Sequence, residues 1–117
     1  MVIFASEAEL VRVLDRADEI IRACVAGSLE LRPFLEELGH LHNYYAFDGH
    51  ESDEEELKLL DRHKERIVWV ERVLEELFQV CADEDATKEI YIKAGRFGSV
   101  EALRRLRVLV ENRNAQR

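Results

Sequence analysis

The 117-residue chain has the length of one domain, and its 47% hydrophobic and 36% charged residues are typical of a folded, soluble protein and exclude a largely disordered one. No apolar run approaches the roughly 20 residues that span a bilayer, and the opening MVIFASEAEL has no basic flank and reaches Glu7 too early for a signal peptide. We therefore expect a cytoplasmic protein with no membrane partner.

The formal net charge of −8 is unevenly distributed along the chain. Residues 86–117 hold 8 basic and 3 acidic groups, whereas residues 1–85 hold 9 basic and 22 acidic groups. An acidic body, 1–85, is thus followed by a basic C-terminal segment, 86–117. We expect both to belong to a single helical domain, 1–117, in which the basic segment packs on or near the acidic body.

The first predicted element is a helix over about residues 7–26. Ser6 and Glu9 match a capping box ahead of it, and Gly27 stands where a left-handed residue ends many helices. Apolar residues recur at helical spacing within it: Leu10, Val13, Leu14, Ala17, Ile20, Ile21 and Cys24.

A second helix is expected to begin between Ser28 and Pro33 and to end near Ala46, before the turn dipeptide Asp48-Gly49. Its apolar stripe contains Phe34, Leu38, Leu41 and Tyr45.

The third predicted helix begins with a second capping box, Ser52 and Glu55, and runs without glycine or proline to about Ala82. A heptad stripe follows its length: Leu60, His63, Ile67, Val70, Leu74, Leu77 and Cys81. A second stripe, Trp69, Val73 and Val80, widens the apolar face. Such a helix would be about 45 Å long, against about 30 Å for the first. The two stripes and the excess length predict a homodimer through this helix.

Residues 88–93 favour a short helix over a strand because the rest of the chain is helical. Ser99 is expected to cap a last helix whose inward residues are Val100, Leu103, Leu106, Leu109 and Val110. The sequence therefore predicts an all-α fold: an antiparallel bundle of three main helices with a C-terminal pair of shorter helices.

Histidines are the candidate metal ligands. His40 and His42 lie near the end of the second helix, and His63 interrupts the apolar stripe of the third. Glu36 and Glu37 lie four and three residues before His40, so either carboxylate can share a helix face with it. A metal-binding bundle that uses these residues is one alternative, although only Glu37-x-x-His40 matches a di-iron motif and we expect no cofactor.

Arg104, Arg105 and Arg107 on the last helix suggest a second alternative, nucleic-acid binding, because two short helices around a glycine turn resemble a helix-turn-helix. Against it, Glu101 lies three and four residues before Arg104 and Arg105 and can pair with them. The net acidity would also repel a phosphate backbone, and we do not expect nucleic acid as a partner.

No catalytic constellation is present, because the sequence lacks a nucleophile motif and a phosphate-binding glycine loop. We therefore expect a non-enzymatic protein–protein interaction module, regulatory or accessory in role and homodimeric. Its expected interaction residues are Trp69, Val73, Val80, Arg104, Arg105 and Arg107.

Overall fold

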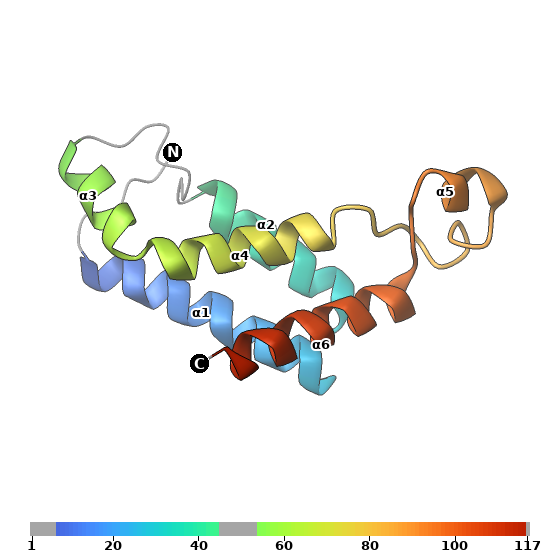
Figure 1. Cartoon of the computed structure of the whole chain (residues 1–117), viewed down its shortest axis with the longest axis horizontal. Helices are drawn as coiled ribbons and strands as arrows, with labels where there is room; N and C mark the ends of the chain where they lie inside the picture. Colours follow the sequence, from blue (N-terminus) through green and yellow to red (C-terminus); the bar gives the residue numbers. More distant parts are fainter. Residues whose placement is uncertain (1–6, 45–53, 117) are drawn as a thin grey trace. The chain divides into compact units, whose positions relative to one another are not determined.

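The computed structural model describes residues 7–44 and 54–116, and within these ranges the regular elements are all helices (Figure 1). The helices are α1 (Glu7–Ala26), α2 (Leu31–Tyr44), α3 (Glu54–Arg62), α4 (Lys64–Glu76), α5 (Glu89–Lys93) and α6 (Ser99–Ala115). The described residues form no β-strand, and the predicted all-α class is confirmed. No helix among them has the length and apolar character needed to cross a membrane.

Helix α1 has the predicted bounds, and all seven residues of its apolar stripe are buried. The residue after its last one is Gly27, whose φ of +85° favours glycine and ends the helix. The amides of Gly27 and Ser28 bond back to the carbonyls of Cys24 and Ala23 at 3.1 and 3.0 Å. Ser6, Ser52 and the predicted end of the second helix near Ala46 lie outside the described residues.

The prediction of one long third helix is wrong, because the helix is interrupted at His63. There the His63 amide bonds to the carbonyl of Leu60, three residues back, at 3.2 Å, instead of the carbonyl four residues back. Neither glycine nor proline marks this position, so nothing in the local pattern predicts the break. Helices α3 and α4 are about 14 and 20 Å long, and the length argument for a dimer through one helix no longer holds.

The predicted end near Ala82 is also wrong, because α4 ends at Glu76. Beyond it the backbone pairs with a distant segment. The Cys81 amide donates to the Phe97 carbonyl at 2.8 Å, and the Phe97 amide donates to the Gln79 carbonyl at 3.3 Å. These bonds accompany the parallel bridge between Val80 and Phe97. We call the segment that they close, residues 81–97, the lobe.

The predicted short helix is confirmed as α5, whereas the predicted start of α6 needs correction. Its N-cap is Gly98, and Ser99 is the first helical residue. The carboxylate of Asp83 accepts hydrogen bonds from the Ser99 amide at 2.7 Å and from the Ser99 hydroxyl at 2.9 Å. The side chain of Val100 is 82% exposed, so its predicted inward position is wrong, and Ala102 is buried in this helix instead.

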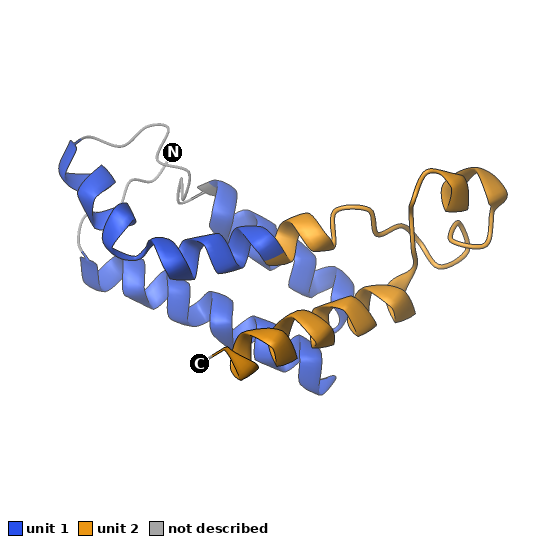
Figure 2. Cartoon of the chain, in the orientation of Figure 1, with its two compact units in different colours: residues 1–72 blue, residues 73–117 orange. Residues whose placement is uncertain are grey.

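The chain divides into two compact units, residues 1–72 and 73–117, with the boundary inside α4 (Figure 2). Unit 1 has 9 basic and 17 acidic residues, a net charge of −8, and unit 2 has 8 of each, a net charge of zero. The whole net charge of the protein therefore belongs to unit 1. Buried apolar side chains form the core of each unit; the largest fully buried ones are Phe34, Leu10, Leu14, Ile20, Leu38 and Val70 in unit 1 and Leu77, Leu106 and Val73 in unit 2.

Candidate functional site

The candidate histidines have separate partners. His63 Nε2 lies 2.8 Å from Glu7 Oε1, so His63 links the break between α3 and α4 to the start of α1. His42 Nε2 lies 3.4 Å from Glu71 Oε2 on α4, while His40 is exposed on α2. Among residues 7–44 and 54–116, no three histidine, cysteine or acidic side chains are grouped so that they could hold a metal ion.

The candidate carboxylates of α2 are bound by arginines. Arg16 of α1 holds Glu37 in a two-point contact, with Nε 2.6 Å from Oε2 and Nη2 3.0 Å from Oε1. Glu36 pairs with Arg32 one turn earlier at 3.4 Å. A metal bound by Glu37 would have to displace the arginine, so the structure does not assemble Glu36, Glu37, His40 and His63 into a site.

Two arginines make three further polar contacts that join α1 to α3 and α4. Arg62 Nη1 lies 2.9 Å from Glu7 Oε2, and Arg66 Nη2 lies 2.9 Å from Asp15 and 2.6 Å from Asp18. The hydrogen bonds that Glu7 accepts from His63 and from Arg62 lower the pKa of its carboxyl below 4.5. These contacts hold helices together, and sequence spacing could not reveal them because 48 to 56 residues separate the partners.

The second apolar stripe of the third predicted helix is not an open surface. Trp69 is 8% exposed and Val73 is fully buried, and Val80, in the turn after α4, is partly buried. Since Trp69 and Val73 are already covered within one chain, neither side chain has surface left for a partner. The interaction surface that the sequence assigned to them has to be sought elsewhere.

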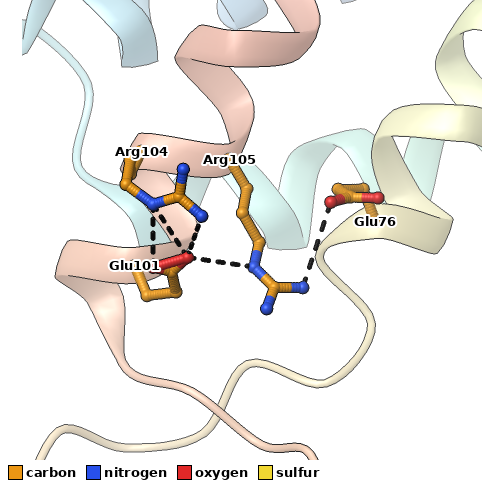
Figure 3. A network of polar contacts seen from close by, with 4 residues as sticks. All are labelled: Glu76, Glu101, Arg104 and Arg105. Atoms are coloured by element: carbon orange, nitrogen blue, oxygen red, sulfur yellow. Dashed lines mark hydrogen bonds and ion pairs between the residues drawn. The ribbon is translucent and has the colours of Figure 1, made fainter.

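The arginines of α6 form a network with acidic side chains of unit 2 (Figure 3). Arg104 donates to Glu101 in a two-point contact, and Arg105 lies 3.3 Å from Glu101 and 3.9 Å from Glu76. The hydrogen bond from Arg104, followed in strength by that from Arg105, lowers the pKa of Glu101 to about 2. The predicted pairing of Glu101 with both arginines is confirmed.

Arg105 also lies over an aromatic ring, with its guanidinium carbon 4.0 Å from the centroid of the buried Phe97. Arg104 and Arg105 are thus engaged inside unit 2, whereas Arg107 is exposed and has no ion pair among the described residues. Of the three predicted arginines, Arg107 alone has no ion pair in the described ranges. One such arginine falls far short of the roughly 6 to 10 phosphate contacts that make binding to nucleic acid strong.

Among the residues that the structure describes, the large apolar side chains that are more than half exposed all lie in unit 2, within residues 78–100. Phe78 is 77% exposed, Ile90 75%, Ile92 58% and Val100 82%. Sequence patterns gave no signal for Phe78, but the two isoleucines stand in the EIYI run on a helix too short to bury both. Exposed apolar groups mark a surface that another protein covers where they lie together in one patch, and Ile90 and Ile92 are the two that share one helix.

Searches against protein-family models, curated proteins and solved structures gave no match to this chain. The function therefore has to be inferred from the surface described above.

Proposed function

We propose that this protein is a non-enzymatic interaction module, regulatory or accessory in role, that forms a homodimer through unit 2. The observation that carries the proposal is the exposure of Phe78, Ile90, Ile92 and Val100. Fully burying a side chain of this kind contributes about 1.5–3 kcal/mol, so a partner that covers several of them gains a substantial free energy. This surface replaces the Trp69 and Val73 stripe, whose side chains the single chain already covers.

The charge distribution supports unit 2 as the contact between two copies. Each copy carries a net charge of −8, all of it in unit 1, whereas unit 2 is neutral. Like charges that face each other across an interface cost free energy, and the cost decreases beyond about 8–10 Å in physiological salt. Two copies that meet through unit 2 bring neutral surfaces together.

We also propose that the main helices of unit 1 alternate in direction, as in an antiparallel bundle. The turn between α1 and α2 is short, and Arg16 of α1 contacts Glu37 of α2 across it. Along α1, Glu7 contacts Arg62, and Asp18, further on, contacts Arg66. This order supports α4 running in the same direction as α1 and opposite to α2.

A cytoplasmic location is part of the proposal. Cys24 and Cys81 are both free thiols, and Cys24 is fully buried in unit 1. Reduced cysteines are the usual state in the cytosol.

Sedimentation velocity of the full chain between about 1 and 100 µM tests the dimer. We expect a monomer–dimer equilibrium with a micromolar dissociation constant, because the four exposed apolar side chains are far fewer than the roughly 20–30 residues that each side of a standard-size interface contributes. The double variant Ile90→Ser/Ile92→Ser should weaken association at least about tenfold. Val68→Ser is the matched control, since Val68 is 47% exposed in unit 1. A wild-type protein that stays monomeric over the whole range would disprove the proposal.

A further inference from the structure

The outward face of α5 carries a charged pair between two apolar side chains. At about 100° of rotation per residue, Glu89 and Lys93 lie about 40° apart, with Ile90 on one side of them and Ile92 on the other. Glu89 Oε1 is 2.8 Å from Lys93 Nζ, and the two side chains are 80% and 74% exposed. All four side chains therefore belong to one exposed surface, which we call the α5 face.

The opposite side of α5 is turned toward the lobe itself. Tyr91 is partly buried, and Lys88 Nζ lies 6.0 Å from the centroid of its ring. Lys88 also pairs with Asp85 at 2.8 Å. Lys88 and Tyr91 are thus engaged locally, and the α5 face is the part of the helix left for a partner.

Backbone hydrogen bonds at both ends hold α5 in place. After the helix, Gly95 has a φ of +80°, and the amides of Gly95 and Arg96 bond back to Ile92 and Tyr91, each at 3.0 Å. At the base of the lobe, the Cys81 amide bonds to the Phe97 carbonyl at 2.8 Å. A helix ordered in this way loses little conformational entropy when it binds, which favours association through a small surface.

The order of charges on the α5 face makes it complementary to itself. In a twofold-symmetric dimer, the same patch of both copies meets, and a helix that crosses the axis at a right angle lies antiparallel to its copy. The first residue of one helix is then next to the last residue of the other, so Glu89 meets Lys93 of the second copy at both ends of the contact. Ile90 and Ile92 of the two copies flank these pairs.

We propose that the dimer forms by antiparallel packing of α5 on α5 of a second copy, with Glu89 of each chain paired to Lys93 of the other. A purely acidic or purely basic partner would match only one end of this face, whereas a second copy matches both. The inference rests on the proposed homodimer and specifies how its two subunits meet.

Charge reversals test the pairing in solution with the full chain. Glu89→Lys places two lysines at each end of the contact, and Lys93→Glu places two glutamates there, so each variant alone should dimerise about tenfold more weakly. An equimolar mixture of the two variants restores an opposite-charge pair at both ends. We expect the mixture to form a heterodimer within about threefold of wild-type affinity. An ion pair within one chain could not be rescued by mixing.

The matched controls are Glu54→Lys and Lys58→Glu on α3. Glu54 and Lys58 form the same pair of residue types at the same spacing, 3.8 Å apart and 86% and 72% exposed, but in unit 1. These variants should leave the dissociation constant unchanged, alone and mixed. Wild-type dimers with no rescue in the α5 mixture would overturn the pairing and leave the homodimer standing. A monomeric wild type would overturn both the pairing and the homodimer.

Discussion

Unit 1 and unit 2 differ in how completely they bury their apolar side chains. Of the 20 apolar residues that are buried in the described part of the chain, 14 belong to unit 1 and 6 to unit 2. The large apolar side chains that are more than half exposed in the same described ranges all belong to unit 2. Unit 1 is acidic on its surface and closed in its core, whereas unit 2 is neutral and leaves apolar groups in water. The comparison shows that most of the buried apolar side chains lie in unit 1, and it supports the proposal that unit 2 is the part of the chain that meets a partner.

The carboxylates whose pKa is shifted or that join helices differ between α1 and α6. In unit 1, Glu7, Asp15 and Asp18 of α1 pair with side chains more than 45 residues away. In unit 2, Glu101 pairs with arginines three and four residues later in the same helix. Contacts between distant segments fix tertiary structure, whereas pairs within one turn stabilise mainly the helix that carries them.

The largest expected effect is a break in the core of unit 1. Leu38→Ala removes a fully buried side chain and should lower the free energy of unfolding by about 2–5 kcal/mol, measured by urea denaturation. Leu57→Ala is the control, because Leu57 is 48% exposed and should cost about 1 kcal/mol or less. Equal costs for the two leucines would contradict a closed core in unit 1.

Two glycine-to-alanine substitutions, one in each unit, should change stability in opposite directions. A Cβ on Gly98 would lie 2.7 Å from Asp83 Oδ1 and 3.2 Å from Ala86 Cβ, so Gly98→Ala should destabilise unit 2 by about 1–3 kcal/mol. A Cβ on Gly39 in α2 meets nothing within 4 Å, and Gly39→Ala should stabilise unit 1 by about 0.5–1 kcal/mol. Thermal unfolding followed by circular dichroism gives both signs, and a shift in the same direction for both would refute this account.

Acid should weaken both units through carboxylates whose pKa is lowered. The folded-state pKa of Glu101 is about 2, below its ordinary 4.5, because Arg104 and Arg105 hydrogen-bond to the charged form. Its contribution to stability is therefore fully present above pH 4.5 and is lost as the pH falls toward about 2. The hydrogen bonds from His63 and Arg62 likewise lower the pKa of Glu7, so its contribution to stability is also lost as the pH falls.

The pH dependence of urea denaturation separates these two carboxylates. The variants Glu101→Gln and Glu7→Gln should each be less stable than wild type above pH 4.5, and the difference should shrink in acid. Because Glu7 joins two helices and Glu101 stabilises its own, we expect the larger loss from Glu7→Gln. If the difference in free energy of unfolding between wild type and variant grew as the pH fell, the lowered pKa values would be contradicted.

The smallest expected effect on folding is at Val100. With 82% of its side chain exposed, Val100→Ser should change the free energy of unfolding by no more than about 0.5 kcal/mol. The same substitution should weaken dimerisation if the second copy also covers Val100, which is exposed in unit 2. A large loss of stability would show that this side chain is part of a core instead.

What the sequence could predict was local. The bounds of α1, the helix end at Gly27 and the pairing of Glu101 with Arg104 and Arg105 all follow from spacings of one turn. The break at His63 and the end of α4 could not be predicted, because partners distant in sequence accompany them: Glu7 at the first and Phe97 at the second.

For the candidate sites too, the sequence predicted which residues are near each other along one helix but not their contacts with other helices. Glu37 lies three residues before His40, a spacing that lets two side chains share a helix face. This spacing could not reveal that Arg16 of another helix binds the Glu37 carboxylate. An apolar stripe likewise predicts a covered face without saying what covers it. Trp69 and Val73 were assigned to a partner, and the chain itself buries them.

The bridge between Val80 and Phe97 has a consequence for how this protein can change in length. Since the Cys81 amide and the Phe97 carbonyl are 2.8 Å apart, the 15 residues between them leave and return at the same point. Doubling the length of a closed loop costs only about 0.6 kcal/mol in chain entropy. Residues can thus be inserted into or deleted from the tip of the lobe while the end of α4 and the start of α6 keep their connection. Related chains should vary most in size at this place, and a new binding specificity can be introduced here without rebuilding either core.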